Sequence, residues 1–120
     1  MLRAGAGLTA VFRADAEPAI GGGHVMRCLT LADALAARGW RCHFACRPGT
    51  PEMVLALAAS GHAVVPLADP SPAALAARWP AGCGLLVVDN YGLDAAYERA
   101  CRPWAGRILV FDDLADRPHD

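Results

Sequence analysis

A histidine that directly follows three glycines is the residue of this sequence best suited to acid–base chemistry. Gly21, Gly22 and Gly23 precede His24, where an apolar helical pattern begins. A glycine run entering a helix lets a ligand approach the backbone closely and exposes N–H groups. The positive end of the helix dipole favours a neutral imidazole, the form that a general base needs. Local chemistry leaves two interpretations open: His24 is a general base, or it only caps the helix.

Arg27 lies one helical turn after His24, on a neighbouring part of the same face. It could bind a carboxylate or phosphate of a ligand, or it could pair with Asp15 of the protein, and both interpretations stay open. The glycine run does not match the dinucleotide-binding fingerprint, because Met26 occupies the place of its last glycine.

Polar residues also follow two later apolar segments. Asp89, Asn90 and Tyr91 follow the first of these segments, where a tyrosine can place its ring and hydroxyl against a sugar. Asp89 either contacts a ligand or orders its loop. Asp112 and Asp113 follow the second segment, and adjacent strand residues point to opposite faces. We therefore expect no metal site, although a Mg²⁺ site at this pair stays open.

The elements that must position these residues alternate between strands and helices. Strands are expected at Leu8–Arg13, Arg41–Cys46, Ala63–Leu67, Leu85–Val88 and Arg107–Phe111. Helices are expected from about His24 to Arg38, from a Thr50 cap to Gly61, over Ser71–Trp79, and from an Asp94 cap to about Cys101. This alternation predicts the α/β class, with a Rossmann-like parallel sheet covered on both faces. Parallel strands end at one edge, so the candidate acids are expected to gather where open α/β folds bind ligands.

Composition excludes several classes of function. The chain has 120 residues, enough for one domain, and 55% of them are hydrophobic, which argues against disorder. A formal net charge of −1 argues against a nucleic-acid partner or an anionic membrane surface. All 11 basic residues are arginine. The absence of lysine excludes a P-loop NTPase and a lysine Schiff base or general base.

The cysteines and the remaining histidines are expected to be structural. Five cysteines without a secretory signal predict reduced thiols in a cytoplasmic protein, and Met1–Ala10 is expected to be neither a signal peptide nor a membrane span. Cys42 and Cys46 are not expected to bind a metal with His43, because His43 would point to the opposite face of its strand. His62 and His119 are expected to be ordinary surface residues.

Three sets of motifs in order carry a resemblance to a known family. They are Arg13-Ala14-Asp15 with Gly23-His24-Val25-Met26-Arg27-Cys28-Leu29 and Leu31-Ala32, then Asp89-Asn90-Tyr91-Gly92-Leu93-Asp94, then Phe111-Asp112-Asp113-Leu114-Ala115-Asp116-Arg117. From about Thr9 to Asp120 the sequence resembles the UDP-2,4-diacetamido-2,4,6-trideoxy-β-L-altropyranose hydrolases of bacterial pseudaminic acid biosynthesis. Asn90 departs from the pattern, since many members have histidine there.

The resemblance implies an architecture and a reaction. It implies that residues 1–120 are the N-terminal Rossmann-like domain of a two-domain fold of the glycosyltransferase GT-B type. The C-terminal domain, which would hold most of the uridine and diphosphate, is absent from these residues. It further implies metal-independent hydrolysis without a cofactor, in which water attacks the anomeric carbon, UDP leaves, and the free 2,4-diacetamido-2,4,6-trideoxy-L-altrose is released with inversion.

The same resemblance implies roles for individual residues. His24 would be the general base. The substrate would be bound by Asp15, Gly22, Gly23, Arg27, Asp89, Asn90, Tyr91, Asp112 and Asp113. Two other classes of function stay open: a GT-B glycosyltransferase, which needs a sugar acceptor in place of water, and a non-catalytic sugar-binding or interaction module.

Overall fold

A computed structural model describes residues 8–15, 23–69, 71–89 and 95–111. The described strands form one five-stranded parallel sheet in the order β3-β2-β1-β4-β5, which is a Rossmann-like arrangement and confirms the predicted fold class. The strands are β1 (Thr9–Ala14), β2 (Arg41–Cys46), β3 (Ala63–Pro66), β4 (Cys83–Asp89) and β5 (Ala105–Val110). The helices are α1 (Gly23–Ala36), α2 (Thr50–Met53), α3 (Leu55–Ala58), α4 (Pro72–Arg78) and α5 (Ala95–Cys101).

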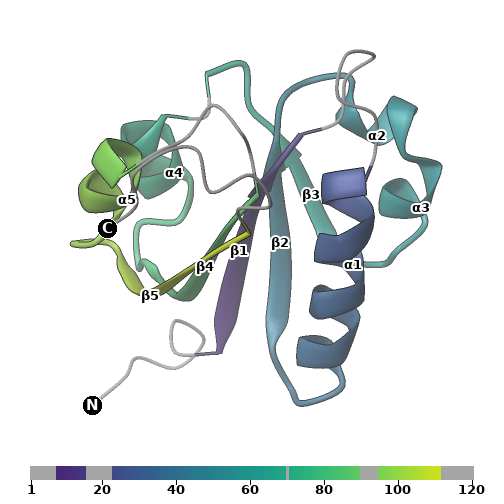
Figure 1. The fold of residues 1–120 in the computed structure, drawn as a ribbon, viewed down its shortest axis with the longest axis horizontal. Helices are drawn as coiled ribbons and strands as arrows, with labels where there is room; N and C mark the ends of the chain where they lie inside the picture. Colours follow the sequence, from purple (N-terminus) through teal and green to yellow (C-terminus); the bar gives the residue numbers. More distant parts are fainter. Residues whose placement is uncertain (1–7, 16–22, 70, 90–94, 112–120) are drawn as a thin grey trace.

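The helices cover both faces of the sheet. Figure 1 shows α1, α2 and α3 on one side and α4 and α5 on the other. The side chains of β1 alternate between two cores: Phe12 packs with the α1 residues, and Val11 packs with α4 and α5. Phe12 stacks on Phe44 of β2 with ring centroids 4.9 Å apart. All six residues of β1 are buried, as expected of a central parallel strand.

The helix predicted between Thr50 and Gly61 is two short helices. Val54 interrupts it with an extended backbone (φ −126°, ψ 89°), and its side chain is buried with that of Leu57 in the core under α1. Its β-branched side chain makes it a poor helix former. Thr50 is not the cap either, because Gly49 holds the N-cap position of α2 in a left-handed conformation (φ 95°).

The other predicted ends agree within a few residues. Helix α1 ends two residues earlier than expected, and Gly39 follows with a φ of 92°. Ser71 caps α4, since its hydroxyl accepts a hydrogen bond from the Ala74 N–H at 3.1 Å. The predicted Asp94 cap lies outside the described residues.

The cysteines have the buried positions predicted for structural thiols. All five cysteines are buried and unpaired with one another. His43 contacts Trp79 on the α4 side of the sheet, whereas Cys42 lies in the core under α1, so the two point to opposite faces as expected. No helix in the described part of the chain has the length and hydrophobicity to span a bilayer.

Candidate functional site at the carboxyl edge of the sheet

The carboxyl ends of β1 and β4 lie side by side at the centre of the sheet. The chain passes from β1 to β2 on one side, and reaches β4 on the other side only after β3 and α4. Such a reversal of strand order creates the crevice where open α/β folds bind ligands. Ala14 is in register with Asp89, and Asp15 directly follows β1. Two of the predicted site acids therefore lie at the point where the strand order reverses.

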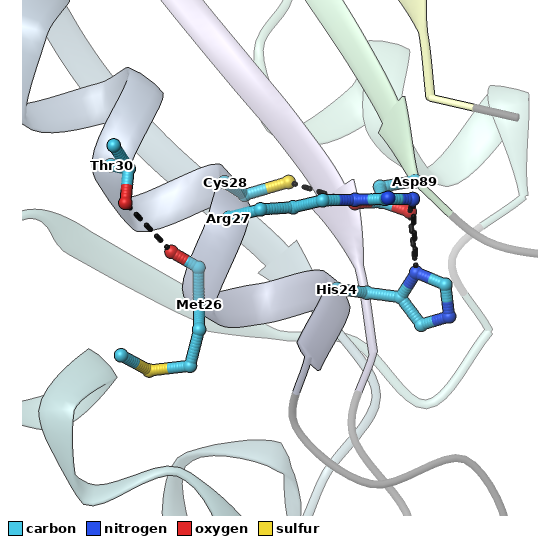
Figure 2. A network of polar contacts seen from close by, with 6 residues as sticks. All are labelled: His24, Met26, Arg27, Cys28, Thr30 and Asp89. Carbon is cyan, nitrogen blue, oxygen red and sulfur yellow. Dashed lines mark hydrogen bonds and ion pairs between the residues drawn. The ribbon is translucent and has the colours of Figure 1, made fainter. Parts of the chain in front are cut away.

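Asp89 orients His24. It is the last residue of β4, and its carboxylate points toward the first turn of α1 (Figure 2). The carboxylate is 1% exposed, and its Oδ1 lies 2.6 Å from Nδ1 of the buried His24 ring. A carboxylate accepts this bond, so we assign the proton to Nδ1. Nε2, which Figure 2 shows pointing away from Asp89, is then the nitrogen able to accept a proton.

Arg27 binds the same carboxylate through two hydrogen bonds. Its Nε donates to Oδ2 at 2.5 Å and its Nη2 to Oδ1 at 2.6 Å, and its guanidinium lies 4.7 Å from the centre of the Phe111 ring. This bidentate geometry combined with stacking is specific to arginine. The alternative pairing of Arg27 with Asp15 is wrong, because Asp15 is held by other residues. Sequence reasoning did not identify Phe111 as the platform for this arginine.

Cys28 also contacts Asp89. Its thiol lies 3.7 Å from Oδ2. Burial raises the pKa of the Cys28 thiol well above its ordinary value, and the negative charge of Asp89 raises it further. A thiol with so high a pKa is a poor nucleophile, so Cys28 contributes packing and a weak hydrogen bond rather than reactivity.

Asp15 belongs to a second polar cluster. Arg13 donates from Nη1 and Nη2 to the two carboxylate oxygens at 2.7 and 2.9 Å, and the Arg47 backbone N–H donates to Oδ1 at 2.8 Å. Burial alone would raise the pKa of Asp15, but the hydrogen bonds and charges of Arg13 and Arg47 outweigh it and lower that pKa below its ordinary value. Asp15 is therefore ionised at neutral pH.

The sequence held a signal for part of this cluster. Arg13 and Asp15 are two residues apart along an extended segment, so their side chains lie on one face. Arg13 is fully buried and also donates to the Ala45 carbonyl at 3.4 Å. Tyr97 of α5 contacts Arg13; burial raises the pKa of its phenol well above the ordinary value. Sequence reasoning missed Arg13, Arg47 and Tyr97 as members of the site.

Several predicted site residues lie outside the described part of the chain: Gly22, Asn90, Tyr91, Asp112 and Asp113. Gly23 is the first residue of α1, and a Cβ built on it would meet no described atom within 4 Å. Among the described residues, no three His, Cys, Asp or Glu side chains are placed to hold a metal ion. The predicted alternative of Mg²⁺ at Asp112 and Asp113 is therefore not addressed by the structure.

The opposite, amino edge of the sheet holds an open cavity of about 300 Å³. Its lining includes Trp40, Arg41, His43 and His62. The prediction that His62 is an ordinary surface residue is wrong: its side chain is 10% exposed, and Nε2 lies 2.8 Å from Asp33 Oδ1. His119, predicted likewise, lies outside the described residues. The cavity is separated from the Asp89 cluster by the length of the strands.

No family model matches the chain, and comparisons with curated proteins and with solved structures find no match.

Proposed function

We propose that this chain is the N-terminal domain of a GT-B-type nucleotide-sugar hydrolase, with His24 as the general base. The observation that supports the proposal is the 2.6 Å contact between His24 Nδ1 and Asp89 Oδ1 at the centre of the carboxyl edge. A buried carboxylate that fixes the tautomer of a histidine is the usual means of orienting a general base. The motif resemblance supplies the substrate class, a UDP-linked 2,4-diacetamido-2,4,6-trideoxy sugar.

The proposed reaction needs one proton acceptor on the protein. A water oxygen forms a bond to the anomeric carbon while its proton passes to His24 Nε2. The bond between that carbon and the diphosphate oxygen breaks, and UDP leaves with the electron pair. Asp89 stabilises the imidazolium that forms, as the acid of a catalytic triad does. UDP is a good leaving group, so the proposal includes no metal ion and no cofactor.

Asp89 and Arg27 are positioning residues in this proposal. The bidentate pair between them fixes the carboxylate, and the carboxylate fixes the imidazole. No described atom lies within 4 Å of a Cβ built on Gly23, which is compatible with the close approach of a ligand to the start of α1. Contacts to the sugar by Gly22, Asn90, Tyr91, Asp112 and Asp113 remain proposals that rest on the resemblance.

The test uses the full gene product that contains these 120 residues, incubated with the UDP sugar and no acceptor, with release of UDP followed over time. We expect His24→Ala to lower kcat by at least about 100-fold, within the range of about 10²–10⁴ typical for loss of a general base. His62→Ala is the matched control, because it removes a histidine at the opposite edge and should leave kcat unchanged.

Three results would contradict the proposal. A folded His24→Ala protein that hydrolyses at a near wild-type rate would return His24 to the role of a helix cap. A wild-type protein that releases UDP only when a sugar acceptor is added is a glycosyltransferase, and one that binds the nucleotide sugar without releasing UDP is a binding module. Melting temperatures of both variants must stay within a few degrees of wild type for the comparison to hold.

A further inference from the structure

Arg47 presents an exposed guanidinium at the carboxyl edge of the sheet. It directly follows β2, and 63% of its side chain is exposed, whereas Arg13 and Asp15 beneath it are buried. Its Nε lies 3.6 Å from Asp15 Oδ2. No other described carboxylate contacts its guanidinium. Within the described part of the chain, the outer Nη nitrogens of Arg47 are therefore open to a ligand at this edge.

Buried groups hold the backbone N–H and the Nε end of the Arg47 side chain. Asp15 accepts the Arg47 backbone N–H at 2.8 Å and attracts Nε of the same residue. Asp15 is in turn held by the two hydrogen bonds from Arg13, which also reaches the Ala45 carbonyl of β2. A guanidinium held in this way loses less conformational entropy when it binds a ligand than one on an unconstrained side chain.

The charges of the described side chains in the two clusters, around Asp89 and around Asp15, do not cancel. Arg27 balances Asp89, but Arg13 and Arg47 share the single negative charge of Asp15, whose lowered pKa keeps it ionised. Within this set of described side chains the arginines exceed the carboxylates by one, and the exposed arginine of the set is Arg47. Helix α1 begins at the same end of the sheet as the connection from β2 to α2 (Figure 1), so the positive end of its dipole adds to this field.

From these observations we infer that Arg47 binds a phosphate group of the ligand at this edge. The arginine fork matches the oxygens of both phosphate and carboxylate, and phosphate is favoured because its charge reaches −2. The inference departs from the resemblance, which implies that a second domain holds most of the diphosphate. It does not require hydrolysis, so it can stand or fall independently of the function proposed for His24.

The probe is inorganic pyrophosphate, titrated into the ¹⁵N-labelled chain without divalent cations. We expect the Arg47 Nε–H resonance to shift on titration, and Arg47→Ala to weaken binding by about tenfold or more, as for loss of a charge-assisted hydrogen bond. The matched control is Arg38→Ala, which removes the same charge from the exposed turn after α1 and should bind as wild type does. Malonate, a dicarboxylate, is titrated in parallel and should bind more weakly than pyrophosphate.

Each other outcome overturns the inference. If the wild-type chain does not bind pyrophosphate, or if Arg47→Ala binds it as tightly as wild type, Arg47 is not a phosphate-binding residue. An equal loss in Arg38→Ala means that binding reflects overall charge, and equal binding of malonate means that the ligand class is wrong. His24→Ala should still bind pyrophosphate, so loss of hydrolysis in that variant and loss of phosphate binding in Arg47→Ala are distinguishable. Circular dichroism and thermal melting confirm that Arg47→Ala folds.

Discussion

Replacing Asp89 with asparagine should destabilise the fold measurably, because one buried carboxylate neutralises Arg27 and accepts from His24. Breaking a buried ion pair by removing one partner costs about 3–5 kcal/mol. The Arg27 side chain is 29% exposed, so its guanidinium can recover part of its hydration when the carboxylate charge is lost. We therefore expect Asp89→Asn to lower the free energy of unfolding by about 2–3 kcal/mol, somewhat less than that range.

Urea denaturation followed by circular dichroism measures this loss. With a slope of about 2 kcal/mol per molar urea, the midpoint should fall by about 1 M or slightly more. Asp33→Asn is the matched control: this aspartate also contacts a histidine, His62, but its side chain is 71% exposed, and such surface pairs contribute at most about 1 kcal/mol. A double-mutant cycle with Arg27→Met isolates the pair. The double variant should be less destabilised than the sum of the single variants, because it leaves neither charge unpaired.

Two results would refute this reasoning. A loss below about 1 kcal/mol in Asp89→Asn would mean that the carboxylate is better hydrated than its 1% exposure indicates. Additive effects of Asp89→Asn and Arg27→Met would mean that the two side chains do not act as a pair.

Three further predictions concern acid, thiols and metals. The pKa of the Asp15 carboxyl is lower in the folded protein than in the unfolded chain, so the Asp15 ion pair stabilises the fold fully at pH values above the unfolded pKa. This stabilisation is lost as the pH falls through the folded pKa. Urea midpoints measured between about pH 6 and 2 should therefore fall less steeply in Asp15→Asn than in wild type. Burial raises the pKa of Cys46 and of Cys101 to about 11 and that of Cys83 to about 12. Iodoacetamide at neutral pH should therefore label the thiols of the native protein slowly, and it should label all five cysteines rapidly in urea. Fast labelling of the native protein would contradict the structure. If the proposed hydrolase needs no metal, EDTA treatment of the full gene product should leave its rate unchanged, whereas a loss restored by Mg²⁺ would assign Asp112 or Asp113 as a ligand.

The sequence predicted the helix and sheet layers of the fold, but not the order of the strands or the interruption of a helix. Alternating strand and helix patterns, and the continuous apolar run Leu85–Val88, were enough to predict a parallel sheet covered on both faces. The order of the strands was not predictable from these patterns, since it depends on which strands pair across the sheet. The interruption at Val54 was missed because Val54 and Leu57 fit the apolar spacing of one helix equally well.

The sequence predicted at which edge of the sheet the candidate residues lie, but not which of them contact one another. Residue types at strand ends predicted Asp15 and Asp89 at the carboxyl edge, because parallel strands end together, and the glycine run predicted His24 at the start of a helix there. The contact between His24 and Asp89 joins residues 65 positions apart, and it depends on β4 lying beside β1. The choice of Asp89 rather than Asp15 as the partner of Arg27 depends on the same pairing. Only Arg13 with Asp15, two residues apart in one extended segment, had a local signal.

The hydrogen bonds of Asp89 indicate whether this carboxylate holds His24 or contacts a ligand. A carboxylate offers about four lone-pair positions. His24 Nδ1 and Arg27 Nη2 contact Oδ1, while Arg27 Nε and the Cys28 thiol contact Oδ2, so protein donors already account for four. A sugar hydroxyl could bind Asp89 only by displacing one of these donors, at the cost of leaving a buried group unsatisfied. Asp89 is therefore better suited to hold His24 than to touch substrate. Among the described residues of this edge, the exposed guanidinium of Arg47 is a better candidate than Asp89 for contact with a ligand.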